Sequence, residues 1–123
     1  MFSNEMQLMI YVDDVLKAVD FWTALDFVVI EKQEVDGTFV VEIAPSKTAA
    51  CHFVLYDREF IASHSPEVAT NAPSIMFVSP NIMELYQKLL TMEVEVGELI
   101  QMAEQLVFNF ADPDGNYYAV SGK

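Results

Sequence analysis

Near its C-terminus the chain reads Phe110-Ala111-Asp112-Pro113-Asp114-Gly115-Asn116-Tyr117-Tyr118-Ala119-Val120. Two apolar, alternating segments flank Pro113-Asp114-Gly115, which is typical of a tight turn because proline presets φ and glycine takes the positive φ. The turn predicts a hairpin between a strand that ends near Phe110 and one that begins near Asn116. Because side chains alternate across a strand, counting from Gly115 assigns each later residue to one face of the sheet.

Working outward from this turn, the same order of elements occurs twice, a strand and a helix followed by three strands. In the first half the predicted strand is 7–12, the helix is 14–25 and the further strands are 27–33, 38–43 and 51–56. In the second half the strand is 74–78, the helix runs from a Ser79 cap and Pro80 to about 92, and the strands are 98–102, 105–110 and 116–120. We therefore expect an α+β fold of two βαβββ modules with mostly antiparallel sheets.

The length of 123 residues predicts one domain, with modules over 5–57 and 73–123 joined by a polar linker over 58–72. No apolar run approaches the roughly 18 to 20 residues that cross a bilayer. The N-terminus lacks the basic start and apolar core of a signal peptide. The one cysteine, Cys51, fits a reducing compartment, so we expect a cytoplasmic location.

The net charge of the chain indicates which classes of partner the protein can bind. The chain has 6 Lys+Arg against 19 Asp+Glu, a formal net charge of −13. Such a field repels phosphate backbones and anionic lipids, so we expect neither nucleic acid nor membrane as a partner. It favours cationic ligands, although solubility alone also accounts for an acidic composition.

Two motifs in this order of elements resemble those of the vicinal oxygen chelate superfamily, which includes glyoxalase I, bleomycin-resistance proteins, fosfomycin-resistance enzymes and extradiol dioxygenases. They are Val12-Asp13-Asp14 before a helix that carries Phe21-Trp22, and Asp112–Gly115 before the last strand. The resemblance implies that the modules form a cup-shaped sheet with helices outside, and that the chain forms a homodimer. One departure is Asp26, which stands where these families have a helix-ending glycine and which tolerates the left-handed conformation.

The resemblance also says where a metal would be held. In metal-dependent members four ligands lie inside the cup, and the matching positions here are Gln7, Val54, Pro73 and Ala119. Three of these side chains cannot coordinate, whereas divalent metals in such enzymes need about three N or O ligands from the protein. We therefore expect no metal cofactor, no Lewis-acid chemistry and no catalytic residue at these positions.

Strand parity assigns an apolar and aromatic set with a few polar groups to the inside of the cup, a composition that suits a small-molecule site. The predicted ligand-binding residues are Gln7, Met9, Tyr11, Glu42, His52, Tyr56, Phe77, Asn109 and Tyr117, with Val54, Ile75 and Ala119 on the same face. Their aromatic rings can stack on a planar ligand or hold a cation. The alternative is that these rings close the cup or pack a dimer interface.

The leading hypothesis is a metal-independent protein that binds and sequesters a small aromatic or cationic compound, nearest in kind to the bleomycin-resistance branch. The alternative is a metal-dependent lyase, isomerase or dioxygenase whose ligands have shifted to Gln7, Glu42 and His52. A His and a Glu on adjacent strands, however, are more often a hydrogen-bonded pair than metal ligands. A third class is an interaction module whose cup is filled by a partner's segment.

Overall fold

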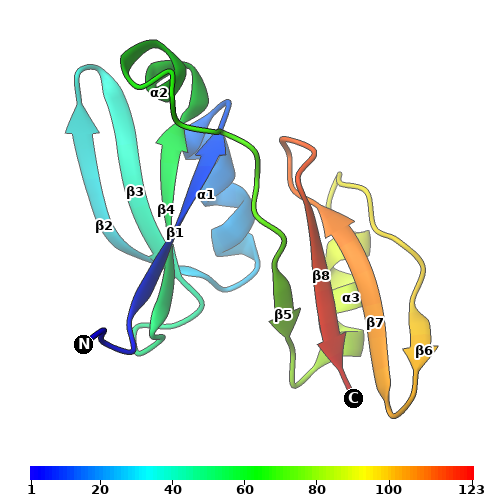
Figure 1. The fold of residues 1–123 in the computed structure, drawn as a ribbon. Coiled ribbons are helices and arrows are strands. Elements are labelled where there is room, and N and C mark those ends of the chain that lie inside the picture. Colours follow the sequence, from blue (N-terminus) through cyan, green and yellow to red (C-terminus); the bar gives the residue numbers. More distant parts are fainter. The chain divides into compact units, whose positions relative to one another are not determined.

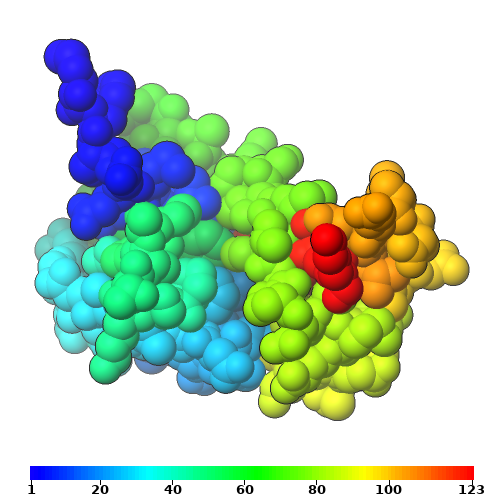
Figure 2. All heavy atoms as spheres, turned by 90° about the horizontal axis from the view of Figure 1, so that it is seen from below, coloured from blue at the N-terminus to red at the C-terminus, as the bar shows by residue number.

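The computed structural model describes residues 1–123, which form two compact units, residues 1–72 and 73–123. Each unit contains a four-stranded sheet, and a helix covers one face of that sheet (Figure 1). None of the helices is both long enough and apolar enough to span a membrane. The first residues stand away from the surface, as the dark blue spheres of Figure 2 show, and Met1 and Phe2 are fully exposed.

The first unit follows the predicted order of elements. Its elements are β1 (Met6–Val12), α1 (Val15–Ala24), β2 (Val28–Val35), β3 (Thr38–Ala44), β4 (Cys51–Asp57) and α2 (Arg58–His64). The strands are ordered β1-β4-β3-β2, with β1 parallel to β4 and the other pairs antiparallel. The hairpin between β2 and β3 turns at Asp36 and Gly37, both with positive φ, as a two-residue turn of this sequence requires.

The second unit repeats this arrangement with shorter outer strands. Its elements are β5 (Met76–Val78), α3 (Ile82–Leu90), β6 (Ile100–Met102), β7 (Gln105–Ala111) and β8 (Tyr117–Gly122). The strand order is β5-β8-β7-β6, again with one parallel pair, β5 with β8. The prediction of an α+β fold with two mostly antiparallel sheets is confirmed.

Helix α1 begins and ends with side chains that the sequence identified. Asp14 is the N-cap, and its carboxylate accepts a hydrogen bond from a backbone N–H in the first turn. At the other end Asp26 has φ 71°, so it takes the left-handed conformation expected of it. The backbone N–H groups of Asp26 and Phe27 donate to the carbonyls of Thr23 and Trp22, at 3.0 and 3.1 Å. This pair of bonds is a Schellman motif, and it turns the chain from the helix into β2.

The core of each unit lies between its helix and its sheet. In the first unit Trp22 of α1 is 1% exposed, and its ring lies 5.0 to 5.3 Å from those of Phe21, Phe27 and Phe53. In the second unit the ring of Tyr86 on α3 meets the buried Phe108 edge-on, at 5.0 Å. Since α1 and α3 each cover one face of a sheet, the opposite face of each sheet is left for other contacts.

The Asp112–Gly115 turn is held by one buried carboxylate. The N–H of Gly115 donates to the carbonyl of Asp112 at 3.0 Å, and Gly115 has φ 81°, as the sequence predicts. Asp112 is 4% exposed, and its side chain accepts from the N–H groups of Asp114 and Asn116, from the Asn116 amide and from the Tyr118 hydroxyl. These bonds fix the register in which β7 and β8 pair.

The start of α3 differs from the prediction. The helix begins at Ile82 with Asn81 as N-cap, two residues later than a Ser79 cap and Pro80 would place it, and it ends at Leu90. The Ser79 N–H donates to the carbonyl of Ser121 at 2.9 Å. This bond continues the pairing of β5 with β8, and the Ser79 hydroxyl accepts from the N–H of Asn81 at 3.2 Å, so Ser79 stabilises the turn before the helix while Asn81 is the N-cap.

The segment predicted as a linker begins with a helix. Asp57 is the N-cap of α2, and its carboxylate accepts from the N–H of Phe60 at 2.9 Å. None of the seven residues of α2 is buried, so the helix lacks the apolar stripe by which a sequence reveals one.

Candidate functional site

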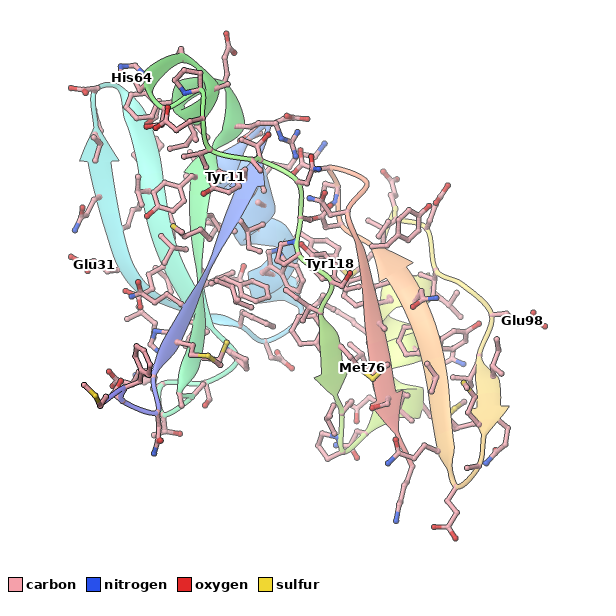
Figure 3. The ribbon with its side chains drawn as sticks, in the orientation of Figure 1. Tyr11, Glu31, His64, Met76, Glu98 and Tyr118 are labelled. Atoms are coloured by element: carbon pink, nitrogen blue, oxygen red, sulfur yellow. The ribbon has the colours of Figure 1, made fainter.

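The strand register separates the side chains of the first sheet into two faces. Phe53 meets Trp22 of α1, so Phe53 and its alternate neighbours lie on the helix-covered side. The other side is called here the face opposite α1. It carries Gln7, Met9 and Tyr11 of β1, Glu31 and Gln33 of β2, Val40 and Glu42 of β3, and His52, Val54 and Tyr56 of β4. Figure 3 shows the sheet with Tyr11 labelled on β1 and Glu31 on β2.

Three polar residues predicted for the site meet on this face. His52 Nδ1 lies 2.6 Å from Glu42 Oε2, and Gln7 Nε2 donates to the same oxygen at 3.2 Å. The other ring nitrogen of His52, Nε2, lies 2.8 Å from the backbone carbonyl of Ala49. Side-chain exposure is 21% for His52 and 17% for Glu42, so the pair is largely shielded from water.

These partners determine the charge of His52. A carboxylate and a carbonyl only accept hydrogen bonds, so both ring nitrogens find suitable partners only when both carry a proton. The hydrogen bond with Glu42 raises the pKa of His52 above its ordinary value of 6.5; partial burial opposes this and the Ala49 carbonyl adds to it. The geometry and the raised pKa therefore both favour the charged imidazolium beside the Glu42 carboxylate, and Gln7 supports that carboxylate.

The donor set does not fit a metal ion. A histidine that ligates a metal offers one ring nitrogen as a lone pair, and both nitrogens of His52 face acceptors. The amide nitrogen of Gln7 points at Glu42. No group of three or more His, Cys, Asp or Glu side chains is placed to hold a metal ion. The cluster of Gln7, Glu42 and His52 is thus satisfied by its own hydrogen bonds.

The same face becomes aromatic toward the ends of β1 and β4. The rings of Tyr11 and Tyr56 stack with centroids 5.8 Å apart and planes inclined by 27°. The Tyr11 hydroxyl lies 4.0 Å from the sulfur of Met9, whose side chain is 54% exposed. Behind the stack, Arg58 donates to the Tyr11 carbonyl at 2.9 Å and pairs with Asp13. Met9 is therefore the exposed side chain of this group, Tyr56 is partly exposed and Tyr11 is buried.

In the second unit the face opposite α3 is defined in the same way. It carries Met76 and Val78 of β5, Ile100 and Met102 of β6, Val107, Asn109 and Ala111 of β7, and Tyr117, Ala119 and Ser121 of β8. The Tyr117 hydroxyl donates to the Glu95 carboxylate, and this bond raises the pKa of Tyr117. Tyr117 is 59% exposed, and its hydrogen bond to Glu95 orients the side chain.

The assignment of Phe77 to this face is wrong. Its ring lies 6.4 Å from that of Phe110 and 5.9 Å from that of Tyr118, both buried on the α3 side. Met76, the register partner of Ala119, takes the place predicted for Phe77 (labelled in Figure 3). Ile75, predicted for the same face, precedes β5, and its carbonyl accepts from the Ala119 N–H at 3.0 Å.

Pairing Val12 with Val78 matches Gln7 to Pro73 and Tyr11 to Phe77, and this alignment of the two modules is one residue out of register. Val15, the first residue of α1, follows Met9 by six positions, and Ile82, the first residue of α3, follows Met76 by the same interval. Met9 also pairs with Val54 as Met76 pairs with Ala119. Alignment on the helix starts therefore matches Gln7 to Ser74 rather than to Pro73. The true start of α3 was the signal that would have identified Met76.

The other predicted residues lie on the face of the sheet to which strand parity assigned them. Asn109 pairs with Ala119 on the face opposite α3, as Glu42 pairs with Val54 in the first unit. Ser74 replaces Pro73 at the fourth family ligand position, and a neutral hydroxyl adds only a weak donor. The four positions, Gln7, Val54, Ser74 and Ala119, thus still lack a set of metal ligands.

Comparison with known proteins gives matches over nearly the whole chain. The family described as the Glyoxalase/Bleomycin resistance protein/Dioxygenase superfamily matches residues 6–120. No match was found among curated proteins.

Solved structures with the same fold include three that cover almost all of this chain. A superfamily member from Sphaerobacter thermophilus DSM 20745 is 23% identical with a TM-score of 0.82, over 100% of this chain and 99% of that one. TnmS3, an antibiotic binding protein from Streptomyces sp. CB03234, is 21% identical with a TM-score of 0.80, over 98% and 96%. A lactoylglutathione lyase from Agrobacterium tumefaciens is 17% identical with a TM-score of 0.74, over 99% and 95%.

Proposed function

Since the chain belongs to the glyoxalase/bleomycin resistance protein/dioxygenase superfamily, we propose that it is a metal-independent protein that binds and sequesters a small aromatic or cationic compound. Within the superfamily we propose that it is nearest in kind to the bleomycin-resistance branch. The observation that carries the proposal is the donor chemistry of the face opposite α1. His52, the best candidate ligand, has both ring nitrogens directed at acceptors.

The rest of that face supports binding rather than catalysis. The exposed Met9 and the partly exposed Tyr56 offer apolar and aromatic area beside the polar cluster. Such a mixture of apolar area with a few polar groups is the usual composition of a small-molecule site. TnmS3, which shares the fold, is described as an antibiotic binding protein, and that description agrees with the proposal.

Ligand-induced stabilisation tests the proposal directly. The purified protein is heated with a panel of planar and cationic compounds, including aromatic antibiotics, in the presence of EDTA. A compound at 100 times its dissociation constant stabilises the folded state by about 2.7 kcal/mol, which raises the melting temperature by several degrees. If no compound in the panel raises it at high excess, the binding function is rejected.

The alternative enzyme remains worth a separate test because Gln7, Glu42 and His52 do lie together. Protein purified without chelator is analysed for metal content, beside the His52→Ala variant. We expect well under one metal ion per chain in both. Stoichiometric metal in the parent protein that is lost in the variant would favour the lyase, isomerase or dioxygenase instead.

The organisation predicted for the chain belongs to the same proposal. We propose that modules 5–57 and 73–123, joined through 58–72, act as one domain, that two chains form a homodimer, and that the protein works in the cytoplasm. The homodimer is checked by the mass of the particle in light scattering after size-exclusion chromatography. A mass of 13.9 kDa, that of one chain, at working concentrations would contradict it.

A further inference from the structure

The second unit places Asn109 of β7 where the first unit places Glu42 of β3. Asn109 pairs with Ala119 across the sheet, as Glu42 pairs with Val54. Each of these two polar side chains stands on the face opposite the helix of its own unit. Because the two positions are equivalent, the hydrogen-bond partners that each side chain finds in its own sheet can be compared directly.

In the first unit, neighbouring side chains occupy the polar group at this position. Gln7 donates to the Glu42 carboxylate at 3.2 Å, and His52 lies 2.6 Å from the same oxygen. A polar group that is bonded in this way offers little to a ligand, because the ligand would have to displace hydrogen bonds that are already made.

In the second unit, the equivalent neighbours do not bond to Asn109. Tyr117, the equivalent of His52, donates its hydroxyl to Glu95 instead. The equivalent of Gln7 is a serine, whose side chain is shorter. The Asn109 side chain is exposed and makes no hydrogen bond within the chain. Its amide donor and acceptor are both open to a ligand.

The side chains around Asn109 are small. Ala119 lies beside it on β8, and Ala111 follows it on the same face of β7. On the other side the N–H of Gly97 donates to the Asn109 carbonyl at 2.7 Å, and a Cβ placed on Gly97 would lie 3.8 Å from that of Asn109. Because glycine has no side chain, the amide can be approached from both neighbouring strands. A flat molecule can therefore lie on this face with one edge against the amide.

The surface around this amide is apolar and uncharged. None of the side chains that β5, β6, β7 and β8 place on the face opposite α3 carries a charge. Glu95 borders the face at the Tyr117 hydroxyl, to which its carboxylate is bonded. An exposed apolar surface of this kind marks a binding site, and it offers no partner to a charged ligand, whose burial would be costly. The large side chains of the face are between 51% and 79% exposed: Met76, Val78, Ile100, Met102 and Tyr117.

We propose that Asn109 is a specificity-determining residue that binds the edge of a neutral, planar aromatic lactam or imide. A primary amide offers a donor and an acceptor side by side, and the N–H and C=O of a lactam or imide complement them with two hydrogen bonds. The apolar side chains of the same face contact the ring system. The inference rests on the proposed binding function and narrows its ligand class. Every residue that it requires belongs to the second unit.

A matched pair of ligands tests these hydrogen bonds. Naphthalimide presents an imide N–H, and N-methylnaphthalimide has the same rings with that hydrogen replaced by a methyl group. In fluorescence titrations the parent protein should bind naphthalimide about tenfold more tightly than the methylated compound. Asn109→Leu should bind both alike, because leucine has a similar shape without the polar atoms. Asn71→Leu changes an exposed asparagine outside the helices and strands, and it should keep the preference of the parent protein.

The side-chain amide of Asn109 reports the contact itself. In ¹⁵N-labelled protein its NH₂ signals are identified by their loss in Asn109→Leu. Naphthalimide should shift these signals and leave those of Asn71 in place. Because both asparagines are exposed, circular dichroism melts should show both variants folded.

The possible failures are distinguishable. If naphthalimide binds equally tightly to the parent protein and to Asn109→Leu, or if the Asn109 signals do not move on binding, the inference is wrong while the binding function stands. If other compounds of the panel stabilise the protein and neither naphthalimide binds, the ligand class is wrong. If no compound stabilises the protein, the proposed function fails and the inference fails with it.

Discussion

At the scale of single residues, His52 shows how partners determine what a side chain can do. The sequence favours His52 as half of a hydrogen-bonded pair with Glu42, with a metal ligand as the alternative. The structure gives both ring nitrogens acceptors, Glu42 and the Ala49 carbonyl. The imidazolium is favoured by this arrangement, and it has no lone pair to offer. His52 is therefore best described as the partner of Glu42 in a hydrogen-bonded pair that joins β4 to β3.

This charge predicts a pH dependence of stability. Because the pKa of His52 is raised by folding, the stabilisation from its protonated form is complete below 6.5 and is lost as pH rises through the raised value. The free energy of unfolding of the parent protein, minus that of His52→Gln, should therefore be larger at pH 5.5 than at pH 8.5. Urea unfolding at both pH values measures it.

The Glu42→Gln variant separates the contribution of the His52–Glu42 pair from the general effects of pH on stability. In Glu42→Gln the acceptor keeps its shape and loses its charge, so the pKa of His52 should fall. NMR titration follows this with His64, the other histidine of the chain, as the reference in the same sample. A His52 that titrates at the same pH in both proteins would contradict the assigned role of Glu42.

At the scale of elements, the end of α1 rests on an aspartate in a conformation that glycine adopts more easily. Asp26 has φ 71°, which carries a steric cost for a residue with a Cβ. Asp26→Gly should therefore raise the free energy of unfolding, by up to about 1 kcal/mol, and Asp26→Val should lower it by about 1 to 2 kcal/mol. Chemical denaturation of the three proteins measures both changes.

Asp26→Asn is the control for charge in this series. Asparagine tolerates the left-handed conformation but removes one negative charge from an acidic protein. Asp26→Asn should raise the free energy of unfolding by only a part of the amount by which Asp26→Gly raises it. An equal gain in both variants would show that charge, rather than backbone conformation, limits stability at this turn.

The sequence predicted correctly which face of the sheet the side chains of a strand occupy where a turn or a long strand fixed the register. The parity of β8 was right because the Asp112–Gly115 turn fixes its register, and that of β1 and β4 because each strand is seven residues long and the two pair along their whole length. The parity of β5 was wrong because three residues contain almost no alternation, and Ser79-Pro80 imitates a helix start. What corrected it, the pairing of Met76 with Ala119, is a contact between residues far apart in the chain.

At the scale of the whole molecule, a net charge of −13 on 123 residues predicts self-repulsion in the folded state. Salt screens such repulsion, with a Debye length of about 30 Å at 0.01 M and 10 Å at 0.1 M. The melting temperature should therefore rise when NaCl is increased from 0.01 to 0.3 M. Scanning calorimetry measures it, and a melting temperature that stays constant or falls would contradict the prediction.

The last hairpin has an optical consequence. The hydroxyl of the buried Tyr118 donates to Asp112, and burial together with this carboxylate raises the pKa of the phenol far beyond that of a tyrosine in water. Its tyrosinate can form only when the hairpin opens and water reaches the ring. In strong alkali the absorbance that the parent protein gains over a Tyr118→Phe variant, which keeps the other four of the five tyrosines, therefore records the opening of the β7–β8 hairpin without any label.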